Sequence, residues 1–188
     1  MSEEITLQKI LIVDDTPQNI KLLVAALKGT YTINIATNGE EGLERASAPS
    51  PPDLILLDIM MPGMDGYEVC RQLKAREQTR DIPVIFLTAL ADEEDEARGL
   101  TAGAVDYITK PFKLPIVKAR IKTHLELKRC HDVLKKMLCE QAAELTKAER
   151  EYTNLFCMLP KKQTPCHSGD DDSTDMDYES RKPAFPSD

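Results

Sequence analysis

The sequence lacks any long apolar run and any recognisable export signal. No stretch approaches the ~20 consecutive apolar residues that a membrane-spanning helix needs. The N-terminal sequence M-S-E-E-I-T has neither the basic nor the apolar region of a secretion signal. We therefore expect a cytoplasmic protein that does not associate with a membrane.

The sequence also lacks a surplus of basic residues and any paired cysteine motif. The formal net charge is −8, whereas a surface that binds nucleic-acid phosphates must be basic. We expect no direct contact with nucleic acid, although a partner could still bind it. The 5 cysteines are odd in number and show no C-x-x-C spacing. Free thiols are therefore expected, not disulfides or a cysteine metal site.

Short apolar segments alternate with helical patterns over the first two thirds of the chain. Strands are expected over 9–13, 31–36, 54–57, 82–87 and 105–109, and helices over 19–27, 41–46, 67–78 and 92–102. This alternation implies a parallel sheet with right-handed crossovers and helices on both faces. The expected fold class is α/β, a flavodoxin-like, doubly wound, five-stranded parallel sheet of order 2-1-3-4-5.

Polar side chains stand where four of these strands end. They are Asp14, Asp15, Asp58, Thr88 and Lys110. The carboxyl ends of parallel strands share one rim, where such folds place their chemistry. Three crowded carboxylates repel one another and need a cation, and oxygen ligands on a rim open to water suit Mg²⁺. Together with an ammonium and a hydroxyl, they indicate a phosphoryl-transfer site.

Each acidic residue also has a purely structural interpretation. Asp14 or Asp15 could simply cap the first helix. Asp65 is expected to be a turn or capping residue and not a ligand. Asp53 is expected at the start of its strand, away from the site. The joint occurrence of the rim residues favours the functional interpretation.

A different pattern begins after Pro115. No Pro or Gly occurs between Pro115 and Pro160, which predicts one long C-terminal helix. A heptad repeat runs through Leu127, His131, Leu134, Leu138, Gln141, Leu145, Ala148, Tyr152, Leu155 and Leu159. We expect a parallel homodimer through this helix; the alternative is a surface helix that packs on its own domain. The expected divisions are an N-terminal tail (1–8), the α/β domain (9–126), a coiled-coil helix (127–159) and a disordered acidic tail (160–188).

Four segments carry a resemblance to a known family. They read I-L-I-V-D-D-T-P, L-I-L-L-D-I-M-M-P-G-M-D-G, V-I-F-L-T-A and D-Y-I-T-K-P-F. Residues 9–129 resemble the receiver domain of two-component response regulators. The resemblance is strongest to receivers that are joined through a long helix to cyclic-dinucleotide or kinase modules.

The resemblance implies a role for each acid at the rim. Asp58 would be the phosphoacceptor and would take a phosphoryl group from a sensor histidine kinase or a phosphotransfer protein. Asp15 would bind Mg²⁺ directly, and Asp14 would bind it mainly through water. Met60 would offer its backbone carbonyl to the metal.

The resemblance also implies a switch. Thr88 would move to hydrogen-bond the phosphoryl oxygen, Lys110 would form an ion pair with it, and Tyr107 would turn inward. The Lys110–Pro111 peptide bond is expected to be cis. The apolar Met60 and Leu90 replace polar groups that could orient an attacking water, which predicts slow loss of phosphate. No enzymatic activity beyond self-phosphotransfer and this autodephosphorylation is expected.

Four interpretations concern the whole protein. The chain is either a stand-alone regulator that acts through protein contacts or the N-terminal regulatory module of a longer signalling protein. A haloacid-dehalogenase-type phosphatase would need a second acid two residues after its nucleophile, where Met60 stands. A receiver that is not phosphorylated is disfavoured because every reactive position is filled.

Overall fold

The computed structural model of the protein describes residues 7–89 and 102–158. The chain divides into two units, Met1–Ala142 and Ala143–Asp188, and the sheet belongs to the first. The helix predicted over 92–102 lies outside the described residues except for its last residue. The acidic tail (160–188), Leu90 and most of the N-terminal tail also lie outside them.

A five-stranded parallel sheet forms the centre of the first unit, with strand order β2-β1-β3-β4-β5. The strands are β1 (Lys9–Val13), β2 (Thr32–Ala36), β3 (Leu54–Asp58), β4 (Val84–Thr88) and β5 (Asp106–Thr109). The predicted fold class and strand order are confirmed. Every residue of β3 and β4 is buried, as expected for central strands covered on both faces.

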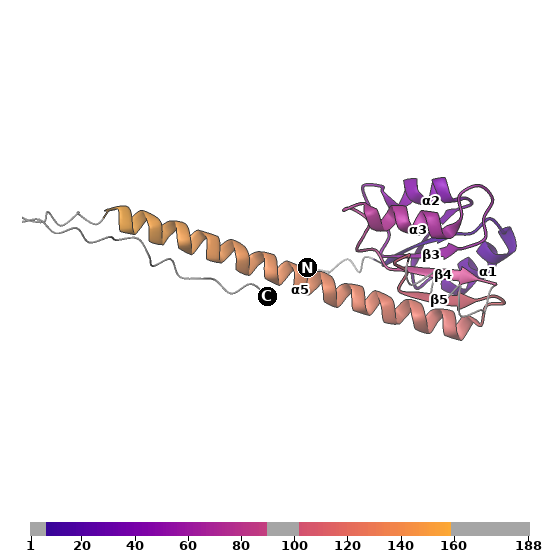
Figure 1. The fold of residues 1–188 in the computed structure, drawn as a ribbon. Helices are drawn as coiled ribbons and strands as arrows, with labels where there is room; N and C mark the ends of the chain where they lie inside the picture. The colour runs from indigo at the N-terminus through magenta and orange to yellow at the C-terminus, as the bar shows by residue number, and fades with distance from the viewer. Residues whose placement is uncertain (1–6, 90–101, 159–188) are drawn as a thin grey trace, which may run out of the picture. The chain divides into compact units, whose positions relative to one another are not determined.

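Helices cover both faces of the sheet (Figure 1). They are α1 (Pro17–Leu27), α2 (Gly39–Ala46), α3 (Gly66–Ala75) and α5 (Leu114–Met158). The two cores divide β1 by alternation, because successive strand residues point to opposite faces. Leu11 and Val13 join the core beneath α2 and α3, whereas Ile10 and Ile12 join the core shared with α1 and α5.

The fourth strand begins later than predicted. It starts at Val84 and not at Ile82. Pro83 has no N–H to donate to a neighbouring strand, and only its carbonyl joins the sheet, accepting from Ile55 N at 3.0 Å.

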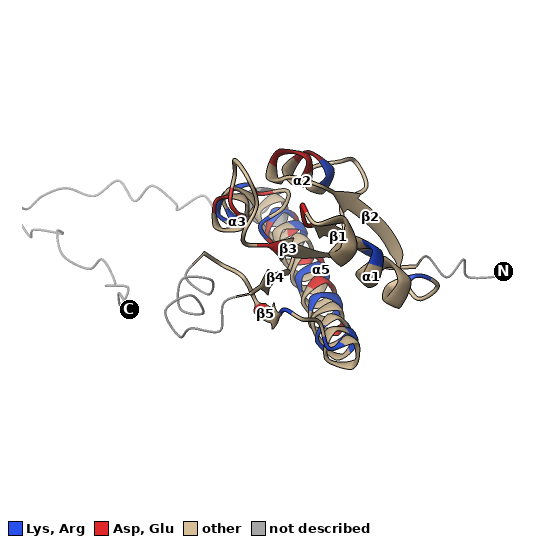
Figure 2. Cartoon of the chain, turned by 90° about the vertical axis from the view of Figure 1, so that its right-hand side faces the viewer, with Lys and Arg blue, Asp and Glu red and all other residues tan. Residues whose placement is uncertain are grey.

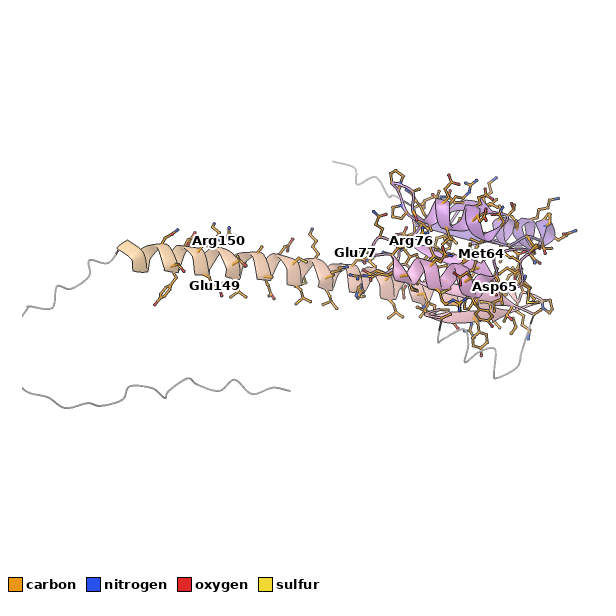
Figure 3. The ribbon with its side chains drawn as sticks, turned by 45° about the horizontal axis from the view of Figure 1, so that its top comes forward. Met64, Asp65, Arg76, Glu77, Glu149 and Arg150 are labelled. Carbon is orange, nitrogen blue, oxygen red and sulfur yellow. The ribbon has the colours of Figure 1, made fainter. Side chains whose placement is uncertain are left out.

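Helix α3 ends earlier than predicted, at Ala75 and not near Gln78. The buried hydroxyl of Thr79 donates to the Leu73 carbonyl at 2.7 Å. The same carbonyl also accepts from Arg76 N at 3.4 Å, and the helix gives way to a loop over residues 76–83. Figure 3 shows Arg76 and Glu77 at this end of the helix, opposite to Met64 and Asp65.

Helix α5 is continuous over 45 residues, which confirms the predicted long C-terminal helix. Its first turns bury Val117, Ile121 and Leu125 at helical spacing. The predicted coiled-coil pairing stays a prediction. None of the helices in residues 7–89 and 102–158 has the length and apolar character to cross a membrane.

Gly66 fixes the distance between β3 and α3. Its N–H donates to the Ile59 carbonyl at 2.9 Å. A Cβ at this position would lie only 2.8 Å from Ile59 Cα and closer still to the backbone oxygen of Asp58. Backbone atoms cannot swing away as a flexible side chain can, so the contact leaves no room for a side chain.

We expect Gly66→Ala to lower the free energy of unfolding by about 1–3 kcal/mol, as overpacking does. In a helix without this contact, the same change would instead stabilise the fold by about 0.4–1 kcal/mol. Urea unfolding measures the sign. Gly63→Ala, at φ +80° with nothing within 4 Å, is the control for backbone strain without a clash. A stabilised Gly66→Ala protein would contradict the close contact.

Candidate functional site

Four predicted site residues come from the carboxyl ends of the strands. Asp58 ends β3 and Thr88 ends β4, while Asp14 directly follows β1 and Lys110 directly follows β5. Asp14, Asp58 and Thr88 are 0%, 3% and 4% exposed. Acidic residues mark the ends of β1 and β3 in Figure 2. The predicted convergence of these strand ends at one rim is confirmed.

The Lys110 ammonium lies between two buried carboxylates. Its Nζ is 2.7 Å from Asp58 Oδ2 and 3.1 Å from Asp14 Oδ2. The Lys110–Pro111 peptide bond is cis, as expected from the resemblance. Burying either carboxylate without a cation would be costly. Lys110 therefore supplies the positive charge that compensates both acids. It does so from the end of β5, which is adjacent to neither β3 nor β1.

Asp14 has a second role at the start of α1. Its Oδ1 accepts from Thr16 N at 2.8 Å, but Thr16 is the N-cap residue of α1 and the helix has no side-chain capping bond, so Asp14 does not cap it. Asn19 Nδ2 lies 3.1 and 3.0 Å from the two oxygens of the same carboxylate. Asn19 was not predicted from the sequence. The available signal was that it lies in the first turn of a helix that begins at this rim. Three donors thus fix the Asp14 carboxylate.

Burial raises the pKa of the Asp58 carboxyl above its ordinary value. The hydrogen bond from Lys110 lowers the pKa, the charge of Asp14 raises it, and the balance remains upward. The second oxygen, Oδ1, accepts from Met60 N at 3.3 Å. The ionised form of Asp58 is therefore less stable in this site than it would be in water, so an added positive charge would stabilise it.

Three carboxylates could share a cation. Oxygen atoms of Asp14, Asp15 and Asp58 all lie within 4.8 Å of one another. Two of these side chains are buried and Asp15 is exposed, so the group is open to water on one side. Mg²⁺ favours a few carboxylate oxygens together with retained waters. The donor set therefore fits the predicted ion.

The remaining predicted residues lie as follows. The Met60 side chain is 63% exposed, and its backbone follows Asp58 into the loop. Tyr107 lies half-buried on β5, with the Arg120 guanidinium 5.5 Å from its ring centre. Leu90, which with Met60 predicts slow loss of phosphate, lies outside the described residues.

The two acids expected to be structural are structural. Asp65 Oδ1 accepts from Glu68 N at 2.8 Å and caps α3. Asp53 Oδ2 accepts from Lys9 N at 2.8 Å beside the start of β1. Neither belongs to the group of carboxylates described above.

One charged group near Tyr107 was missed by the sequence reasoning. Asp106 pairs with Arg120, and its Oδ2 lies 3.0 Å from His124 Nε2. The i, i+4 spacing of Arg120 and His124 places both on one helix face. Only the position of β5 beside that face, which is a tertiary feature, shows that Asp106 lies opposite them.

Comparisons with known proteins identify the family. The model of the response regulator receiver domain matches residues 10–122. A probable cyclic di-GMP phosphodiesterase of Vibrio cholerae is 48% identical over 132 residues, which are 70% of this chain and 30% of that protein. The response regulator PleD of Caulobacter vibrioides is 44% identical over 128 residues, 68% of this chain and 28% of that protein. The chain thus spans less than a third of these relatives.

A solved structure supports the assignment of the rim. The receiver domain of the sensor histidine kinase PA1611 of Pseudomonas aeruginosa has a TM-score of 0.59 and 33% identity, and the match covers 63% of this chain and 98% of that one. That structure holds a magnesium ion coordinated in its active site cleft. Receiver domains bind Mg²⁺ in an acidic pocket, and this chain has the corresponding cluster.

We expect Asp58→Asn to stabilise the magnesium-free protein at pH 7. The raised pKa means that ionised Asp58 opposes folding, so removing the charge raises the denaturation midpoint. The gain should shrink as the pH falls through the raised pKa, because the wild-type carboxyl then becomes protonated. Thermal unfolding of the wild type and the variant at pH 7 and at pH 4 measures the gain at each pH.

In the presence of Mg²⁺ we expect Asp58→Asn to have the opposite effect, a loss of stabilisation. An ion that binds only the folded state at 100 times its Kd adds about 2.7 kcal/mol, and Asp58→Asn should reduce this gain. Asp65→Asn is the matched control, because Asn also caps helices well and Asp65 lies outside the cluster. If Asp58→Asn destabilised the protein more at pH 7 than at pH 4, the unfavourable burial of this charge would be refuted.

Proposed function

The chain belongs to the response regulator receiver family, and we propose that Asp58 is its phosphoacceptor. The phosphoryl group would come from a sensor histidine kinase, the usual partner of receivers, or from a phosphotransfer protein. One observation carries the proposal: a buried carboxylate at the end of the central strand lies 2.7 Å from Lys110 Nζ. Asp14 and Asp15 complete the acidic group beside it.

The proposed reaction transfers the phosphoryl group between two nucleophiles. A carboxylate oxygen of Asp58 attacks the phosphorus of phosphohistidine and forms a P–O bond. The P–N bond breaks, and the imidazole leaves with the electron pair. Lys110, already beside Asp58, would form an ion pair with the phosphoryl oxygens of the acyl phosphate that results.

The acids would hold the ion that this chemistry uses. Asp15 would bind Mg²⁺ directly, Asp14 mainly through water, and Met60 through its backbone carbonyl. Bound Mg²⁺ neutralises charge on the phosphoryl oxygens. Asn19 and Thr16 orient Asp14 by hydrogen bonds, which keeps the carboxylate in place when the metal is absent.

Thr88 and Tyr107 would convert phosphorylation into a change of surface. The Thr88 side chain is buried at the end of β4, next to the strand that carries Asp58. Its hydroxyl would bond a phosphoryl oxygen, and the half-buried Tyr107 would turn inward. The two arrangements coexist, and the phosphoryl group shifts their populations.

The output would be carried by α5. The heptad repeat supports a parallel homodimer through this helix. An alternative is a regulatory module of a longer signalling protein with a cyclic-dinucleotide or kinase output. The observation that favours this alternative is the 30% coverage of the Vibrio cholerae phosphodiesterase relative, whose matching region is only part of its length.

We expect the full chain to take one phosphoryl group from phosphoramidate in the presence of Mg²⁺. Asp58→Asn should abolish this gain of mass because it removes the nucleophile, and Asp65→Asn should preserve it. Intact-protein mass spectrometry measures the modification. Phosphorylation of the Asp58→Asn protein to the wild-type level would show that the acceptor lies elsewhere.

The phosphorylated protein should lose its phosphate slowly, over many minutes or longer. The exposed Met60 side chain offers no group that could orient an attacking water. We expect Met60→Asn to accelerate the decay at least severalfold. The decay is followed in Mg²⁺ without a phosphatase, with Met64→Leu as a control on the same loop. Wild-type decay within seconds would refute this expectation.

A further inference from the structure

Helix α5 carries a stripe of exposed apolar side chains, which we call the seam. Its described members are more than half exposed: Leu127 58%, Leu134 60%, Leu138 65%, Leu145 65% and Tyr152 72%. Together with His131, Gln141 and Ala148 between them, they occupy successive heptad positions at alternating steps of four and three. Lys, Arg, Asp and Glu mark other positions along the helix (Figure 2). Such a regular apolar stripe on a charged helix fits the same stripe of a second copy.

The first part of the seam faces the chain's own loop over residues 76–83. A pocket of about 380 Å³ lies between them. Its lining includes Leu127, Lys128 and His131 from α5 and Arg80, Asp81 and Pro83 from the loop. Two of these residues, Leu127 and His131, are successive positions of the heptad repeat. A second helix laid along this part of the seam would therefore lie against the loop.

An ion pair fastens the loop to the helix. Lys135 Nζ lies 2.7 Å from Asp81 Oδ2. The hydrogen bond from Lys135 lowers the pKa of Asp81, and the same bond raises the pKa of Lys135. Lys135 directly follows the seam residue Leu134, so its side chain flanks the seam. The loop begins at the end of α3, where Arg76 and Glu77 lie (Figure 3).

We propose that the Asp81–Lys135 ion pair is a latch that limits how far a second copy can pair with α5. With the latch closed, the seam is available from Leu134 onward, and Leu127 and His131 face the loop. With the latch open, the second copy's helix also covers the first heptad. The partner is a second copy of this chain, so the inference rests on the homodimer proposed above.

The strength of the latch suits a reversible device. The side chains of Asp81 and Lys135 are 40% and 54% exposed, and exposed ion pairs contribute little to stability. Loss of the pair should therefore change the self-association constant by about two- to fivefold. Salt screens exposed charges, so high ionic strength should open the latch in the wild-type chain as well.

The test compares three single variants of the full chain with the wild type. Lys135→Gln and Asp81→Asn each remove one half of the latch. Lys136→Gln is the matched control, because Lys136 is the next residue and is 78% exposed, and its ion-pair partner Glu140 lies on the same helix 3.9 Å away. Sedimentation equilibrium at low and high salt gives the self-association constant, and amide exchange reports on the loop over 76–83.

The latch variants should self-associate about two- to fivefold more tightly than the wild type at low salt, and the difference should fade at high salt. Their loop amides should exchange faster, whereas Lys136→Gln should match the wild type in both measurements. The charge swap Asp81→Lys with Lys135→Asp should restore the wild-type values. Dimers whose affinity is the same in all variants would overturn the latch alone. Monomers in every variant would overturn the dimer and, with it, the latch.

Discussion

Two buried carboxylates that share one ammonium are the constraint on which the rest of this structure depends. Asp14 and Asp58 are almost fully enclosed, and Lys110 bridges them. Burial still raises the pKa of Asp58 despite that bridge. The folded domain therefore keeps a negative centre that remains incompletely compensated, and this is the condition that favours a divalent ion and phosphoryl chemistry at the rim.

The order of the strands makes this arrangement possible. β1 and β3 are neighbours, so their ends bring Asp14 and Asp58 together without any help from loops. β5 lies beyond β4, so the cation must reach across the strand that ends in Thr88. A lysine side chain has that length, and the buried threonine lies on the intervening strand. The proposed phosphoacceptor, the cation beside it and the proposed switch residue are thus brought together by one parallel sheet.

The sequence predicts this site well because each apolar strand ends abruptly in a polar residue. The strand order and the convergence of Asp14, Asp58 and Lys110 follow from that pattern. Details set by individual side-chain contacts were not predictable. The buried Thr79 hydroxyl bonds the Leu73 carbonyl across the end of α3, and the Asp81–Lys135 pair joins residues 54 positions apart. Neither spacing has a local signature.

The contact at Gly66 has a consequence for how this protein can vary. The segment between Asp58 and Gly66 is closed at both ends, because Gly66 N bonds Ile59 O and leaves no space for a side chain. A side chain at position 66 would therefore press on the backbone of Asp58 itself, the proposed phosphoacceptor. The exposed Met60 side chain has no such contact to keep and can vary, whereas Ile59 and Met61 on either side of it are held in the core.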